Sequence, residues 1–362
     1  MSEQKEIVNR PKLPHEEDYA DKNVIYHSVR EKPFQLYGFY NPLTEPEFKR
    51  LPDELGENVS QGIKEHYKHP SGGRVRFSTD SSVIILRTYM KNVGRLNMFS
   101  LLATAGFDLY IDDPQNQTST FHACFHPSMS TVDGYITMMR FPTRQMRFFT
   151  LNFPLHSDVS DVELGLDPDA IIGEGMAYRN QLPVVFYGSS ITQGVCASRP
   201  GNTYVNMISR RYNMNFMNLG LAGSCRAEDP IVEYLSDLEM CAFVSDYDYN
   251  APTLDHLRST HFSMYQKIRE KHPDIPYVMI TRPNFSTNPE DSAKRRAIVI
   301  ESYHKALEMG DKNVYYIDGE SFFKGEYEDS CTVDAVHPND LGFRLMSEGI
   351  GCVLGRLQLF KL

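Results

Sequence analysis

The sequence predicts a two-domain protein in which an all-β sandwich precedes a three-layer α/β/α sandwich built on a parallel sheet. The chain has 362 residues, more than the roughly 100–200 residues of one typical domain. From about Asn23 to Leu166 the apolar residues occur in short runs separated by turn residues. After about Leu182, strand-like runs alternate with amphipathic helical segments. Alternation of this second kind is typical of βαβ units and a parallel sheet.

The first half, which we place at residues 23–175 after a polar tail of residues 1–22, is expected to be all-β. Its strand-like runs are FQLYGFY, GGRVRFSTDSSVIILRTYM, GFDLYIDD, GYITMMRFP, MRFFTLNFP and VELGL. Ser-Gly-Gly, Asp-Ser-Ser and Asp-Asp-Pro between the runs favour turns. Apart from a short helical piece at Ser100–Gly106, no stretch predicts a helix longer than about three turns. The segment Asp167–Pro183 is interpreted as a linker with a short helical turn.

The second half, which we place at residues 182–362, is expected to form the α/β/α sandwich. Its predicted strands are Val184–Tyr187, Phe216–Leu219, Ala242–Ser245, Tyr277–Thr281 and Val314–Ile317. Its predicted helices are Thr203–Tyr212, Thr253–Lys271, Pro289–Met309 and Asn339–Leu359. Five strands can form a parallel sheet covered by helices on both faces, and they are too few for a closed β/α barrel.

Composition and charge exclude several classes of protein. The chain is 41% hydrophobic, 23% charged and 12% aromatic, which fits a folded globular protein. Its formal net charge of -10 would repel a phosphate backbone, so nucleic acid is not an expected partner. Because no signal peptide and no run of about 20 apolar residues is visible, we expect no membrane partner and a cytoplasmic location. A removed signal would make the location secreted or periplasmic.

The sequence predicts no metal ion and no organic cofactor. The cysteines form no CxxC pair with zinc-ligand or redox spacing, and we expect them to be reduced and mostly buried, with a disulfide in an oxidising compartment as the alternative. They are Cys124, Cys196, Cys225, Cys241, Cys331 and Cys352. His122 and His126 lie too far apart on a β-type segment to share one ion. No glycine-rich phosphate loop occurs, which argues against nucleotide chemistry.

Two groups of residues at the predicted carboxyl ends of strands are candidates for nucleophilic chemistry, because reactive groups in an open parallel sheet collect there. In Gly188-Ser189-Ser190 the glycine allows a sharp turn that projects a serine hydroxyl, and helix capping by the serines is the alternative. In CTVDAVHPNDLGF, Asp334 and His337 precede the last helix, and the following proline keeps the histidine on the loop. Such a carboxylate can fix the imidazole tautomer beside a nucleophile, or the pair can be purely structural.

Gly223 in NLGLAGSC and Asn250 in FVSDYDYNAP follow the next two predicted strands. A glycine can present its backbone N–H to a neighbouring loop, and an asparagine offers an amide donor. Donors held in place before the reaction stabilise a tetrahedral oxyanion, although both residues are also ordinary turn formers. Asn339 or Asp340 is expected only to cap the last helix.

The candidates occur in the order Ser, Gly, Asn, Asp and His, and in this order the segment Val184–Leu359 resembles the SGNH or GDSL-type esterases and lipases. GSSITQG stands for the GDS(L/I)T block, NLGLAGS and DYDYNAP fall on the next two blocks, and DAVHPNDLG matches the DxxHP pattern of the last. The resemblance implies the flavodoxin-like SGNH-hydrolase fold. This sequence departs from the family pattern at two places. Ser189 stands where the family usually has Asp, and the third block reads Asp-Tyr-Asn-Ala where the family usually has Gly-x-Asn-Asp. In that block Tyr247 and Tyr249 are expected to flank the site and narrow its pocket.

The resemblance also implies a catalytic mechanism. Ser190 would be the nucleophile, His337 the general base and Asp334 the carboxylate that orients the imidazole. The backbone N–H groups of Ser190 and Gly223, with the side chain of Asn250, would form the oxyanion hole. This chemistry requires no cofactor.

The first half resembles, less specifically, the jelly-roll module of two-domain carbohydrate esterases, whose aromatic residues stack on sugar rings. Most aromatic residues of this half are still expected in the core. The resemblance implies hydrolysis of a short acyl ester, acetyl in particular, on a sugar or oligosaccharide. Two alternatives stay open: a broad acyl or lipid esterase that prefers longer chains, and a catalytically silent glycan-binding protein. The sequence does not fix the oligomeric state.

Overall fold

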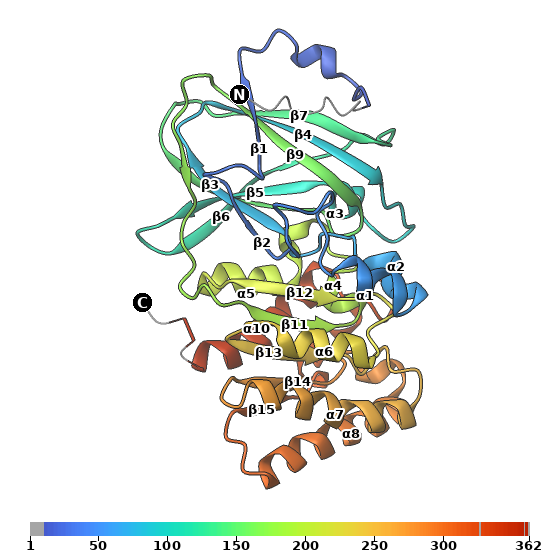
Figure 1. Ribbon diagram of the computed structural model, residues 1–362. Coiled ribbons are helices and arrows are strands. Elements are labelled where there is room, and N and C mark those ends of the chain that lie inside the picture. Colours follow the sequence, from blue (N-terminus) through green and yellow to red (C-terminus); the bar gives the residue numbers. More distant parts are fainter. Residues whose placement is uncertain (1–10, 326, 358, 361–362) are drawn as a thin grey trace.

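A computed structural model describes residues 11–325, 327–357 and 359–360. In Figure 1 a β-sandwich formed by the first half of the chain lies above an α/β unit formed by the second half. Residues 1–10 of the predicted tail, residue 358 of the last predicted helix and residues 361–362 lie outside the described residues.

The sandwich consists of two antiparallel sheets. One has the strand order β1-β9-β4-β7, and the other has the order β10-β3-β8-β5-β6 with β2 paired to β3. The strands are β1 (Ile25–Ser28), β2 (Gln35–Tyr37), β3 (Arg74–Thr79), β4 (Val83–Asn92), β5 (Phe107–Asp113), β6 (Thr118–Phe125), β7 (Gly134–Arg140), β8 (Arg147–Asn152), β9 (Asp158–Leu166) and β10 (Ile172–Glu174). Phe77, Leu86 and Phe149 belong to the core between the sheets, because alternate residues of a strand share a face. The predicted all-β sandwich is confirmed.

Strand β3 is buried on both of its faces, which explains its alternating sequence Arg-Val-Arg-Phe. Val75 belongs to the sandwich core. Arg74 and Arg76, on the opposite face, hydrogen-bond the side chains of Asn215 and Asn213 in the α/β unit. One strand therefore closes the sandwich and also contacts the second half of the chain.

Three short helices lie within the first half: α1 (Asp53–Asn58), α2 (Gln61–His66) and α3 (Leu101–Ala105). Helix α3 matches the predicted helical piece. Around α1 and α2, the side chains of Leu51, Ile63 and Tyr67 are buried in the same hydrophobic cluster as Leu221 of the α/β unit. The division of the sequence near residue 175 therefore does not coincide with the division between the two cores. The helices α1 and α2 are too short to show a helical apolar period in the sequence.

The α/β unit is built on a parallel sheet with the strand order β12-β11-β13-β14-β15. The strands are β11 (Val184–Gly188), β12 (Phe216–Gly220), β13 (Ala242–Asp246), β14 (Tyr277–Ile280) and β15 (Val314–Ile317). Each strand lies within one residue of its predicted bounds. Strands β11, β13 and β14 are buried along their whole length, as expected for a parallel sheet covered on both faces.

Helices cover both faces of this sheet. They are α4 (Ser190–Gln193), α5 (Tyr204–Tyr212), α6 (Asp229–Asp237), α7 (Leu254–Lys271), α8 (Pro289–Glu308), α9 (Glu320–Phe323) and α10 (Asp340–Arg356). Side chains of α5 and α10 pack with Phe186 and Val244 on one face. Side chains of α6, α7 and α8 pack with Tyr187 and Phe243 on the other face. The predicted three-layer architecture is confirmed.

Some elements differ from the sequence prediction. Strand β6 was not among the predicted strand-like runs, although the segment around His122 was interpreted as β-type. Its first residues, such as Thr118 and Thr120, are polar and exposed, so the usual apolar alternation is missing. Helix α6 and strand β1 were also not predicted. The expected helical turn between Asp167 and Pro183 is wrong, because Ile172–Glu174 forms β10 and pairs antiparallel with the edge of β3.

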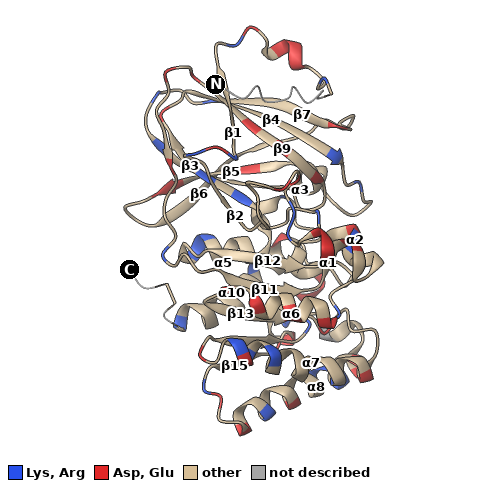
Figure 2. Ribbon diagram, in the orientation of Figure 1, with Lys and Arg blue, Asp and Glu red and all other residues tan. Residues whose placement is uncertain are grey.

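Figure 2 shows acidic and basic residues interspersed along both halves of the chain. Among the residues that the structure describes, no helix has both the length and the apolar character needed to cross a bilayer. Within the same ranges, no cluster of three or more His, Cys, Asp or Glu side chains is placed to hold a metal ion. The cysteines are free, and, as predicted, most are buried: Cys196, Cys225, Cys241 and Cys331.

Candidate active site

Strand β11 ends at a glycine because no side chain fits at this position. A Cβ on Gly188 would lie 2.1 Å from Oγ1 of Thr192. The chain then enters α4, and Oγ of Ser189 accepts a hydrogen bond from the backbone N–H of Ile191 at 3.2 Å. Ser189 is fully buried and caps the helix, whereas Ser190 is half-buried and lines a cavity. The two adjacent hydroxyls therefore have different surroundings.

Ser190, His337 and Asp334 form a continuous chain of hydrogen bonds. Oγ of Ser190 lies 2.9 Å from Nε2 of His337, and Nδ1 of His337 lies 2.7 Å from Oδ2 of Asp334. Burial alone would raise the pKa of Asp334, but hydrogen bonds from His337 and from the backbone N–H of Val336 hold that pKa below its ordinary value. An ionised Asp334 accepts a hydrogen bond from Nδ1–H of His337, and this tautomer leaves Nε2 free to accept the proton of Ser190.

The loop that carries Asp334 and His337 is held from several sides. The backbone N–H of Val333 donates to the carbonyl of His337 at 2.9 Å. Asn284 donates its side-chain amide to the carbonyl of Val336. Asn339 caps α10 directly after the loop, as the sequence predicts. These contacts fix the loop without any bound substrate, as a preorganised site requires.

Gly223 and Asn250 line the same cavity as Ser190. The backbone of Gly223 has φ +68°, in the left-handed region that favours glycine. Oδ1 of Asn250 accepts a hydrogen bond from the backbone N–H of Cys225 at 3.3 Å, which leaves the Nδ2 group as the available donor. The structure therefore brings together Ser190 and His337 with both of the predicted oxyanion donors.

The loop around Asn250, where the sequence departs from the family pattern, is fixed by a buried arginine. Arg295 of α8 donates from Nη1 to the carbonyls of Asp248 and Ala251 at 2.6 Å and 2.9 Å. Burial raises the pKa of Asp248 to about 6. This role was not predicted, because Arg295 is one of several charged residues in a helical segment that was expected to be solvated.

Of the two tyrosines expected to flank the site, only Tyr249 lines the cavity. The prediction for Tyr247 is wrong. Its side chain is buried and its ring stacks on His261 of α7, with 5.8 Å between centroids. Its hydroxyl also contacts Thr260, so the packing of α7 against the sheet, rather than the pocket, accounts for this tyrosine.

The cavity beside Ser190 has a volume of about 400 Å³ and receives side chains from both halves of the chain. The first half supplies His66, Leu96, Met98, Phe99 and His156. The second half supplies, besides the residues already described, Val195, Ala222 and Val336. Apart from the histidines, the wall formed by the first half is apolar. The sequence did not identify these residues, because loops distant in sequence reach the site only through the packing of the two halves.

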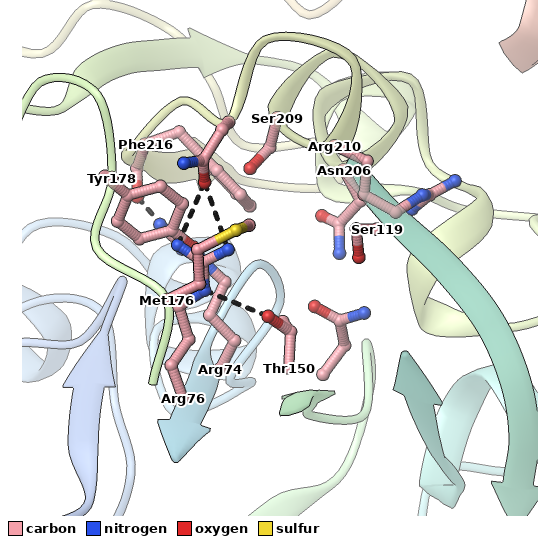
Figure 3. A pocket seen from close by; sticks show the side chains of 12 residues that line it. Arg74, Arg76, Ser119, Thr150, Met176, Tyr178, Asn206, Ser209, Arg210 and Phe216 are labelled. Carbon is pink, nitrogen blue, oxygen red and sulfur yellow. Dashed lines mark hydrogen bonds between the residues drawn. The ribbon is translucent and has the colours of Figure 1, made fainter. Parts of the chain in front are cut away.

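A second, much smaller cavity lies between the two halves, away from Ser190. Figure 3 shows Arg74 and Arg76 of β3 in its lining, together with Tyr178 and Thr150. Nε of Arg74 donates to the hydroxyl of Tyr178 at 2.5 Å, and Nε of Arg76 donates to Oγ1 of Thr150 at 2.9 Å. The volume of about 20 Å³ suits roughly one water molecule. The cavity is part of the contact between the halves rather than a second site for a substrate.

The arrangement around Ser190 can perform nucleophilic acyl chemistry. It combines a hydroxyl with a base within hydrogen-bonding distance, a carboxylate that orients the base, and donors on neighbouring loops. None of these roles needs a metal ion.

Sequence comparison finds matches over both halves of the chain. Residues 181–354 match the GDSL-like Lipase/Acylhydrolase family, and residues 24–172 match a family described as the N-terminus of Esterase_SGNH_hydro-type. A search of curated protein sequences gives no significant match.

Comparison with solved structures finds the same two-part architecture. A candidate GDSL-like lipase from Bacteroides ovatus ATCC 8483 is 27% identical, with a TM-score of 0.83, covering 94% of this chain and 99% of that chain. A salicylyl-acyltransferase from a tetracycline biosynthetic pathway is 17% identical, with a TM-score of 0.79 and coverage of 94% and 99%. An acetyl xylan esterase from the rumen bacterium Butyrivibrio proteoclasticus is 12% identical, with a TM-score of 0.60 and coverage of 94% and 100%. The last two similarities are similarities of fold.

Proposed function

Because the chain belongs to the GDSL-like lipase/acylhydrolase family, we propose that it is a serine ester hydrolase that forms an acyl-enzyme on Ser190. The observation that carries this proposal is the hydrogen-bonded series from Ser190 through His337 to Asp334, with distances of 2.9 Å and 2.7 Å. A matching fold alone would not support an activity, since one fold serves many functions.

In the proposed reaction, Oγ of Ser190 attacks the ester carbonyl carbon while Nε2 of His337 takes the hydroxyl proton. The carbonyl oxygen becomes an oxyanion, which accepts hydrogen bonds from the N–H groups of Ser190 and Gly223 and from the amide of Asn250. Collapse of this intermediate breaks the bond to the alcohol oxygen, and the alcohol leaves with the proton from His337. A water molecule activated by the same histidine then hydrolyses the acyl-enzyme, and the acid and the free Ser190 result.

A fluorophosphonate probe tests the proposed nucleophile directly. The expected result is one covalent adduct on Ser190, formed with loss of fluoride and located by mass spectrometry of the digested protein. The variant Ser189→Ala is the matched control and is expected to be labelled as well, because the hydroxyl of Ser189 caps α4. An unlabelled wild-type protein would instead favour the silent glycan-binding alternative.

For the substrate, the first candidate is a short acyl ester, acetyl in particular, on a sugar or oligosaccharide. The similarity of the whole chain in fold to an acetyl xylan esterase supports this candidate. The cavity beside Ser190 also supports it. Side chains of the first half line this cavity, so the larger alcohol part of such an ester would contact the first half of the chain. Release of acetate from acetylated xylan and from acetylated monosaccharides is the measurement that tests it.

The second candidate is an esterase for larger apolar acyl groups, and it is favoured by the wall formed by Leu96, Met98 and Phe99. Leu96 and Met98 are 52% and 44% exposed, although both line the cavity. Burying such surface against an acyl chain contributes about 0.8 kcal/mol per CH₂ group. A series of p-nitrophenyl esters from acetate to octanoate separates the two candidates, because the second predicts that kcat/KM rises with chain length.

Under this second candidate, Met98→Ser is expected to lower kcat/KM for the octanoate ester by about tenfold and to leave the acetate ester almost unchanged. Met309→Ser is the matched control, because Met309 is exposed at the end of α8 and is not part of the cavity lining. An equal loss on both esters in Met98→Ser would contradict an acyl-binding role for this wall.

A further inference from the structure

Gln193, the last residue of α4, is a fully buried side chain whose amide connects three parts of the molecule. It lies three residues after Ser190 in the sequence and belongs to the same short helix. The backbone around it is tightly packed, since a Cβ on Gly220 would lie 2.2 Å from the backbone nitrogen of Gln193. The hydroxyl of Ser71 also donates to the carbonyl of Gln193.

The acceptor end of this amide holds the loop that contains Gly223. Oε1 of Gln193 accepts a hydrogen bond from the backbone N–H of Ala222 at 2.9 Å. Ala222 immediately precedes Gly223, whose own N–H is one of the proposed oxyanion donors. A shift of the Ala222 peptide would therefore reorient the donor that follows it.

The donor end of the amide is held by two histidines from the first half of the chain. Nε2 of Gln193 lies 3.1 Å from Nδ1 of His156 and 3.2 Å from Nδ1 of His69, with the carbonyl of Leu155 at 3.3 Å. Because an amide nitrogen only donates, an Nδ1 atom that bonds it must accept and must be unprotonated, and the two N–H groups are shared among these three neighbours.

Both histidines are held in the neutral form by their surroundings. Burial is the main cause that lowers the pKa of His156 to about 3, and the charges of His66, Arg50 and His337 lower it further. Burial is also the main cause that lowers the pKa of His69 well below its ordinary value, and the charges of the neighbouring histidines and of Arg50 add to it. Asp158 lies 3.8 Å from Nε2 of His69 on the far side of that ring.

We propose that Gln193 is a positioning residue for the esterase reaction, which holds the Ala222–Gly223 segment for oxyanion stabilisation while His69 and His156 hold Gln193. This inference rests on the proposed function. An amide is suited to the position because it accepts from Ala222 and donates to the histidines at the same time. The first half of the chain is thereby part of the catalytic apparatus, and its role is not limited to binding a substrate.

The first test is Gln193→Met, which keeps the approximate shape and removes both hydrogen-bonding functions. We expect kcat for p-nitrophenyl acetate to fall by about 10- to 100-fold, with KM changed by less than about threefold. Binding of a trifluoromethyl ketone, which forms an oxyanion on Ser190, is expected to weaken by the same factor as kcat falls. Gln35→Met is the matched control, because Gln35 is a half-buried glutamine of β2 that bonds the backbone N–H of Gly175.

A second pair of variants keeps the test valid if Gln193→Met folds poorly. His69 does not line the cavity itself, although its ring contacts His66 and His156, which do. His69→Leu removes the acceptor and is expected to lower kcat by about tenfold, whereas His69→Asn supplies an amide oxygen near the Nδ1 position and is expected to restore most of that loss. A purely structural role would lower stability in both variants without this difference in kcat.

All rates are expressed per site labelled by a fluorophosphonate at completion, so that unfolded protein is not counted. A kcat for Gln193→Met within about threefold of wild type, or a loss confined to KM, would overturn the positioning role. Failure of the wild-type protein to label or to hydrolyse any ester would contradict the proposed function itself, which is a different outcome.

Discussion

Ser190→Ala is expected to lower kcat for hydrolysis of an activated acetyl ester by on the order of 10⁶-fold, the scale seen when a catalytic serine is removed from other hydrolases. The reason is the position of its Oγ, which is 2.9 Å from Nε2 of His337. Without this hydroxyl no acyl-enzyme forms, and only the oxyanion donors and substrate binding remain to accelerate attack by water. Initial rates and single-turnover kinetics on p-nitrophenyl acetate measure the effect.

Ser189→Ala provides the internal comparison for this result. Because Ser189 is the N-cap of α4, its loss is expected to cost about 0.5–2 kcal/mol of stability and to leave kcat within a few-fold of wild type. If the two variants lost activity equally, or if Ser190→Ala kept wild-type activity, the assignment of the nucleophile would be wrong.

Arg50→Ala is expected to lower the free energy of unfolding by about 3–5 kcal/mol, because it leaves several buried carbonyl groups without a donor. Nε of Arg50 donates to the carbonyl of His69 at 2.6 Å, and Nη2 donates to that of His66 at 2.8 Å. Nη1 donates to the carbonyls of Asn218 and Gly220 at 3.1 Å and 2.6 Å. Burial lowers the pKa of Arg50 to about 9. A single side chain therefore joins the first half of the chain to the end of β12.

Urea unfolding of Arg50→Ala beside Arg144→Ala measures this effect. Arg144 also makes several hydrogen bonds, to Asp80 and Asp169, but it is exposed. Its loss is expected to cost about 1 kcal/mol or less. A similar small cost for Arg50→Ala would show that water or a local rearrangement satisfies the carbonyl groups.

The sequence predicts the α/β unit well because its strands are continuous apolar runs, of which β11, β13 and β14 are buried along their whole length. Val314–Ile317 was predicted with its observed bounds. The polar first residues of β6, such as Thr118 and Thr120, carry no such pattern, since they are exposed and the strand is at the edge of a sheet.

The candidate site was predictable to the extent that short motifs follow strand ends. Ser190 follows β11, and His337 precedes α10, so the parallel sheet brings both to one edge. Gln193, Arg50 and His156 were not predicted for these roles, because each acts through contacts with residues far away in the sequence. The sequence signal for Gln193 was its position within GSSITQG. That position does not distinguish a side chain that only packs in the core from one whose amide hydrogen-bonds two distant segments.

The burial of Leu51, Ile63 and Tyr67 in the core of the α/β unit has a consequence for the order of folding during synthesis. These residues leave the ribosome well before Leu257 and Met264, which belong to the same hydrophobic cluster. At ordinary rates of translation this delay lasts on the order of ten seconds. During that time we expect the nascent first half to expose apolar side chains that its own sandwich cannot cover, and such surface is prone to aggregation until the second half is complete.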